Sequence, residues 1–152
     1  MKVHKLEFVI ANPEDEENYP QFIPTIDGHK EAASLLIFPL ELSEKKDGMY
    51  PILNCGCGEW GCGGYYVDVK NTEEYIIWDG LYGLVNQKRK IEVLHAVTPI
   101  YFLRKEYNAL VKNLLVQKDR YKYEANVYNI DKEQYETGGL KSLVYMEELD
   151  LE

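Results

Sequence analysis

The sequence is poor in several residue types, and each shortage excludes a class of protein. Its 152 residues include only three cysteines. An odd and small number of cysteines argues against the disulfide framework of small secreted domains. Lysine and arginine total 17 against 26 aspartate and glutamate residues, which gives a net charge of −9. An acidic surface of this kind repels phosphate groups, so we expect no binding to nucleic acid or to membranes.

Long apolar runs are also missing. No stretch is long enough to cross a bilayer as a helix, and the first ten residues are too charged for a signal peptide. Together with the few cysteines, these features predict a cytoplasmic protein. The chain has no internal repeat or low-complexity linker, so we expect a single domain over residues 1–150. Residues 151–152 could be vector-derived.

The abundant residue types suit a soluble domain whose surface can bind another protein. Apolar residues make up 45% of the chain and charged residues 28%, as in ordinary globular proteins. Thirteen tyrosines stand against four phenylalanines. Tyrosine combines an apolar ring with a polar tip and therefore suits half-exposed sheet faces and interfaces. The charge favours a basic protein partner, although it would also serve solubility alone.

Alternating apolar and polar residues predict a sheet of short strands. The pattern indicates strands near residues 2–11, 22–26, 49–55, 64–70, 75–78 and 92–97. Three of these follow one another between residues 49 and 78, which is typical of an antiparallel meander. Asp27-Gly28 is a turn signal, and residues 81–86 fit a loop. The apolar run within residues 32–42 fits either a buried strand or a helix, and Pro39 favours the strand.

One helix is well defined by its periodicity. Its apolar residues recur at helical spacing, at Tyr107, Leu110, Val111, Leu114 and Leu115. The helix could start at Thr98-Pro99, or residues 98–102 could form a strand before a helix that starts near Arg104. The apolar cluster at residues 100–103 favours the strand. We therefore predict an α+β fold, a largely antiparallel sheet with one main amphipathic helix, about residues 107–118, packed on one face.

Residues 54–66, NCGCGEWGCGGYY, hold all three cysteines. The glycines suit a reversal between two strands. If the turn is centred on Glu59-Trp60, Cys57 lies opposite Cys62. Cys55 then points to the same face as Cys57, because side chains two apart in a strand share a face. The three thiols are therefore predicted to meet on one face of a hairpin.

Three interpretations of this hairpin compete. The cysteines could be small apolar residues of a structural turn, which the missing fourth cysteine favours. They could instead bind zinc, with a fourth ligand from His95, His29, His4 or a carboxylate, and His95 is the best candidate because it falls in a predicted strand. Thiol chemistry is the third, although neither a helix N-terminus nor a partner base is evident. We expect no cofactor and no catalytic cysteine.

The run CGCGEWGCGGYYVDV, followed by IIWDG, resembles a motif of small uncharacterised bacterial proteins. These share a Cys-x-Cys-Gly-x-x-Gly-Cys turn, a following strand and a second strand that ends in tryptophan. The resemblance covers roughly residues 50–115 and includes the spacing from Phe102 to Tyr107. It implies a strand before the helix, but it implies no activity, ligand or partner.

Two functional hypotheses follow. The first is a non-enzymatic protein-binding module whose acidic, tyrosine-rich surface neutralises a basic partner, as a toxin-immunity protein does. The second is a small metal- or thiol-dependent protein that uses Cys55, Cys57, Cys62 and His95.

Overall fold

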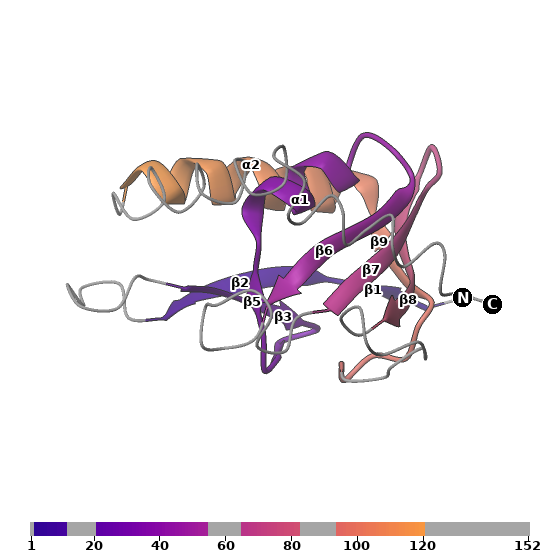
Figure 1. Ribbon diagram of the computed structural model, residues 1–152, viewed down its shortest axis with the longest axis horizontal. Coiled ribbons are helices and arrows are strands. Elements are labelled where there is room, and N and C mark those ends of the chain that lie inside the picture. The colour runs from indigo at the N-terminus through magenta and orange to yellow at the C-terminus, as the bar shows by residue number, and fades with distance from the viewer. Residues whose placement is uncertain (1, 12–20, 55–64, 83–93, 121–152) are drawn as a thin grey trace.

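The computed structural model describes residues 2–11, 21–54, 65–82 and 94–120 (Figure 1). The strands are β1 (Val3–His4), β2 (Leu6–Ala11), β3 (Gln21–Ile26), β4 (His29–Lys30), β5 (Ser34–Leu35), β6 (Gly48–Asn54), β7 (Tyr65–Asn71), β8 (Tyr75–Tyr82) and β9 (Ile100–Leu103), and the helices are α1 (Ile37–Ser43) and α2 (Arg104–Arg120). Figure 1 shows both helices on one side of the strands.

The strands form two sheets. The large sheet has the order β1-β9-β8-β7-β6-β5, and each pair is antiparallel except β1 and β9. The small sheet has the order β2-β3-β4 and is antiparallel throughout. The predicted α+β fold and its antiparallel meander are therefore confirmed.

The single strand predicted over residues 2–11 is wrong, because the chain changes sheets at Lys5. β1 belongs to the large sheet and β2 to the small one. At the change, the Lys5 N–H donates to the Asp27 carboxylate at 2.9 Å, and the Lys5 carbonyl accepts from the Asp27 N–H at 2.9 Å. These two bonds fix Lys5 to the turn that joins β3 to β4.

That turn was predicted correctly. Asp27 and Gly28 connect Ile26 to its partner His29 and have φ values of 53° and 85°. Two positive φ values are the mark of a type I′ hairpin turn, which Asp-Gly adopts easily. Pro24 lies in β3, the central strand of the small sheet. Its nitrogen faces away from β2, on the same side as its carbonyl, which accepts from the Glu31 N–H at 3.0 Å. Proline therefore removes no hydrogen bond to β2.

Helix α1 corrects the preference for a strand within residues 32–42. β5 ends at Leu35, and the helix runs from Ile37 to Ser43. Pro39 is therefore the third helical residue, where the backbone nitrogen has no acceptor within the helix, so proline removes no hydrogen bond. The first helical bond joins the Leu40 N–H to the Leu36 carbonyl at 3.2 Å.

Two loop and strand boundaries also differ from the prediction. β8 continues through Leu81 and Tyr82, so the loop predicted at residues 81–86 is wrong there. Leu81 is fully buried and lies opposite Val67, which explains why the strand extends. Residues 94–96 form bends and residue 97 has no regular structure, so the strand predicted over residues 92–97 is wrong at its described end.

The junction of β9 and α2 confirms the strand before the helix. β9 ends at Leu103 and α2 begins at Arg104. The Arg104 guanidinium donates to the carbonyls of Thr72 and Glu44 and to the Asn71 side chain, at 2.7–3.0 Å. Arginine has five donors in a rigid fork, so one side chain ties the helix start to two turns.

The helix packs its apolar face onto the large sheet as predicted. Tyr107, Leu110, Val111 and Leu114 are all buried. Opposite them, the Trp78 ring meets Phe102 edge-on at 5.0 Å and Tyr107 at 6.5 Å. These contacts place the hydrophobic core between α2 and the strands β8 and β9.

A chain of hydrogen bonds crosses this core. The Trp78 indole N–H donates to the Tyr107 oxygen at 3.2 Å, and Tyr107 and Ser43 hydroxyls lie 2.7 Å apart. The Ser43 hydroxyl donates to the Leu40 carbonyl at 2.6 Å. Indole is only a donor and a carbonyl only an acceptor, so the Tyr107 hydroxyl must donate to Ser43. Burial raises the pKa of Tyr107, which stays neutral in this chain.

Candidate functional site

The three cysteines of the predicted site, Cys55, Cys57 and Cys62, lie outside the described residues, so their clustering stays a prediction. The strands that flank them are antiparallel neighbours as predicted, but the predicted register, which places Asn54 opposite Tyr65, is shifted by one residue. β6 ends at Asn54 and β7 begins at Tyr65, and the two strands are antiparallel neighbours with Leu53 opposite Tyr65.

His95, the proposed fourth ligand, does not lie in a strand. It is held instead by the carboxylate of Glu31, the residue that follows β4. Glu31 accepts from the His95 backbone N–H at 2.9 Å and contacts ring Nδ1 at 2.6 Å. The Glu31 side chain is 1% exposed and the His95 side chain 54% exposed. The His29 ring stacks on the His95 ring with centroids 4.4 Å apart.

This arrangement leaves one ring nitrogen of His95 for a ligand. A carboxylate on Nδ1 orients a histidine in the way that metal sites use, with Nε2 directed at the ion. Within residues 2–11, 21–54, 65–82 and 94–120, however, no three histidine, cysteine or acidic residues have the arrangement of a metal site. His4, another histidine considered as a ligand, is paired with Asp27 in the small sheet's turn.

A different surface is formed by the side of the large sheet that faces away from α2. Trp78 and Phe102 point into the core, so the alternating residues on β8 and β9 point outward. The register places Tyr75 opposite Leu103 and Ile77 opposite Tyr101. We call these four half-buried residues, Tyr75, Ile77, Tyr101 and Leu103, the outer face.

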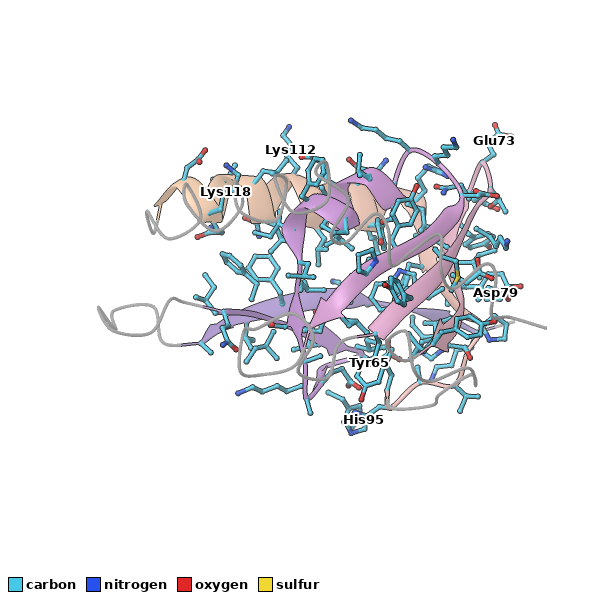
Figure 2. The ribbon with its side chains drawn as sticks, viewed as in Figure 1. Tyr65, Glu73, Asp79, His95, Lys112 and Lys118 are labelled. Atoms are coloured by element: carbon cyan, nitrogen blue, oxygen red, sulfur yellow. The ribbon has the colours of Figure 1, made fainter. Side chains whose placement is uncertain are left out.

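The outer face combines aromatic rings with acidic neighbours. Tyr75 and Tyr101 meet edge-on with centroids 5.9 Å apart. Asp68 and Lys70 on the neighbouring strand form an ion pair at 3.4 Å, and Lys70 lies opposite Ile77. Half-buried Asp79 follows on β8, and Figure 2 shows it near the edge of the molecule. A tyrosine-rich apolar centre with a charged border is typical of protein-binding surfaces.

Sequence reasoning noted the tyrosines without placing them on one face. The alternation at residues 75–78 was visible, but both sets of alternating residues are apolar or aromatic. Their burial distinguishes them: Ile76 and Trp78 are fully buried, whereas Tyr75 and Ile77 are half-buried. Nothing in the local sequence pointed to Glu31 as the partner of His95.

The comparisons with known proteins add no assignment. No protein-family model matches the sequence, and searches of the curated proteins and of the solved structures also found no match. Neither described helix is both long and apolar enough to cross a membrane.

Proposed function

We propose that this chain is a non-enzymatic module that binds a basic protein partner through the outer face, as an immunity protein binds its toxin. The observation that carries the proposal is the half-exposed group Tyr75, Ile77, Tyr101 and Leu103 on the sheet side that α2 does not cover. Tyrosine is enriched among the residues that contribute most to binding energy at interfaces.

Charge supports the choice of partner. The chain carries −9 overall, and acidic residues lie on and beside the strands of the outer face, including Asp68 and Asp79. Opposite charge on a partner accelerates association and excludes acidic competitors. A partner with basic residues around an apolar patch would therefore fit this surface.

The test is site-specific photo-crosslinking in cells that produce the protein. A photoreactive amino acid replaces Ile77 on the outer face, and the matched control carries it at exposed Lys112 on α2 (Figure 2). We expect a crosslinked protein from position 77 only, with a basic sequence. Adducts from position 112 alone would contradict the proposal.

The purified complex then tests the surface itself. Tyr101→Ala should weaken binding by about 1–3 kcal/mol, because an interface tyrosine at the centre of a patch contributes this much. Binding should also weaken as salt is raised, since salt screens attraction between exposed charges. A complex that tolerates both changes would bind elsewhere on the protein.

A zinc protein is the second candidate, favoured by one observation. The buried Glu31 carboxylate fixes His95 through Nδ1, which is the support that a zinc-bound histidine has. The ligands would be Cys55, Cys57, Cys62 and His95.

Zinc content and thermal melting with and without a strong chelator separate the two candidates. We expect no bound zinc and no effect of the chelator. Near-stoichiometric zinc with chelator-induced loss of stability would instead support the second candidate. His95→Asn is then the sharpest variant, because its amide can still donate to Glu31 but it lacks Nε2, so it should lower the zinc content without freeing the buried carboxylate.

A further inference from the structure

His95 has an exposed ring that a buried carboxylate holds on one side. The His95 side chain is 54% exposed, whereas the Glu31 side chain is 1% exposed. One Glu31 oxygen accepts from the His95 backbone N–H at 2.9 Å, and the other contacts ring Nδ1 at 2.6 Å. Figure 2 shows His95 at the periphery of the molecule, at the bottom of the view. A buried charge therefore fixes the orientation of a ring that solvent can reach.

The hydrogen bonds assign the proton on this ring. An ionised carboxylate is only an acceptor, so Glu31 accepts both from the backbone N–H and from the Nδ1–H of His95. In a neutral imidazole with its proton on Nδ1, the lone pair is on Nε2. A carboxylate on Nδ1 also makes the other nitrogen more basic. Nε2 of His95 is therefore a nucleophilic nitrogen at the protein surface.

A second imidazole lies against the first. The His29 ring stacks on the His95 ring, with centroids 4.4 Å apart and planes inclined by 17°. His29 is exposed, and no hydrogen bond or ion pair joins it to a carboxylate within the part of the chain that the structure describes. A neutral imidazole has one N–H to donate. His29 therefore offers a donor on one side of the His95 ring plane.

We propose that His95 is a phosphorylation site, at which Nε2 accepts a phosphoryl group from an N-phosphorylated donor. The Nε2 lone pair attacks phosphorus and forms an N–P bond. The N–P bond of the donor breaks, and its electron pair leaves with the donor nitrogen, which takes a proton from solvent. Nδ1 keeps its proton, so the His95 ring becomes positively charged, and the Glu31 carboxylate stabilises that charge. One N–P bond replaces another, so the transfer needs no further reactant.

The stacked ring favours a phosphoryl group over an acyl group at Nε2. A phosphoryl group is tetrahedral, so its oxygens lie on both sides of the imidazole plane, and the His29 N–H can donate to an oxygen on its own side. An acyl group on an imidazole nitrogen is planar and lies close to the plane of the ring. Nε2 cannot hold zinc and a phosphoryl group at once, so this inference is independent of the zinc candidate and of the outer face.

Phosphoramidate is the probe, because it is a small N-phosphoryl donor, and the three histidines of the chain are matched controls. His29 is exposed without a carboxylate, whereas His4 has a carboxylate, Asp27, but its side chain is only 12% exposed. The purified full-length protein reacts at about pH 8, where an ordinary imidazole is mostly neutral. High salt screens the repulsion between the donor and the net charge of −9.

Peptide mass spectrometry over time gives the rate at each histidine. We expect His95 to be phosphorylated about tenfold or more faster than His29 and His4, which is the usual effect of a supporting carboxylate. Equal rates at His29 and His95 would mean that exposure alone decides reactivity and would overturn the proposal. Absence of phosphorylation at His95 would overturn it as well.

Glu31→Gln tests the positioning role of Glu31. Glutamine keeps the length of the side chain but has one oxygen for two donors and no charge. We expect transfer to His95 to slow about 10–100-fold. We also expect phosphorylation at Nδ1 as well as Nε2, which phosphorus–nitrogen coupling in NMR spectra distinguishes. An unchanged rate with only the Nε2 product would overturn the proposal. A variant that loses its fold is recognised by a reactive His4, and the rates in the parent then decide.

His29→Ala tests the second imidazole. Transfer to His95 should slow about fivefold, the equivalent of one hydrogen bond. Lys30→Ala is the matched control, because it removes a positive charge from the next residue of β4, whose side chain points to the opposite face. Equal slowing by both substitutions would mean that only charge matters and would overturn the two-histidine site.

Discussion

Replacing Tyr107 by phenylalanine tests the hydrogen-bond chain that connects strand β8 with helices α2 and α1. The hydroxyl accepts from Trp78 on β8 and donates to Ser43 on α1, and both partners are fully buried. Removing it leaves the indole N–H without an acceptor and removes one donor from Ser43. Ser43 keeps its bond to the Leu40 carbonyl, so Trp78 bears most of the loss.

The expected cost follows from the burial of the orphaned donor. Leaving a buried donor unsatisfied costs about 1–3 kcal/mol, whereas an exposed hydroxyl costs little to remove. For a chain of this size, each kcal/mol lowers the melting temperature by about 2–4 °C. Urea denaturation followed by far-UV circular dichroism measures the loss directly. The control is Tyr101→Phe on the half-exposed outer face, for which we expect a change within about 0.5 kcal/mol.

A double-mutant cycle identifies the bond that is responsible. Ser43→Ala removes the acceptor of Tyr107, so Tyr107→Phe and Ser43→Ala both break the same bond. Their effects should therefore not add, and the double variant should be more stable than the sum predicts by about 0.5–1.5 kcal/mol. Full additivity, or a Tyr107→Phe variant as stable as the Tyr101→Phe control, would refute the hydrogen-bond chain.

Three further perturbations test the core and two titrating groups. Leu114→Ala should lower the free energy of unfolding by about 2–5 kcal/mol by opening a cavity in the fully buried face of α2, whereas Val116→Ala at the exposed face should leave the urea midpoint nearly unchanged. Burial raises the pKa of Tyr107, so its contribution to the free energy of unfolding is fully present below about pH 10, where this tyrosine is neutral in the unfolded chain too, and falls above that pH. Urea titrations from pH 8 to 11 should show this loss, about 1.4 kcal/mol per pH unit, in the parent but not in Tyr107→Phe. The Lys5 N–H bond lowers the pKa of Asp27, so its contribution is present above about pH 4 and is lost as pH falls; Asp27→Asn should be less stable than the parent at pH 6, and the difference should shrink in acid.

The parts of the fold that the sequence predicted are those with one buried face. The apolar period of α2 and the alternation along β6, β7 and β8 each arise because one face of the element is buried. Such a pattern can be recognised within the segment itself. Proline at residue 39 misled the prediction because its effect depends on position. It breaks a helix interior, but in the first turn of α1 it removes no hydrogen bond.

The parts that were missed depend on contacts between distant residues. Glu31 and His95 are 64 positions apart, and neither belongs to a pattern that could pair them. The outer face was missed for a related reason. Ile76 and Ile77 are the same residue type, and only the packing of α2 decides which of the two is covered.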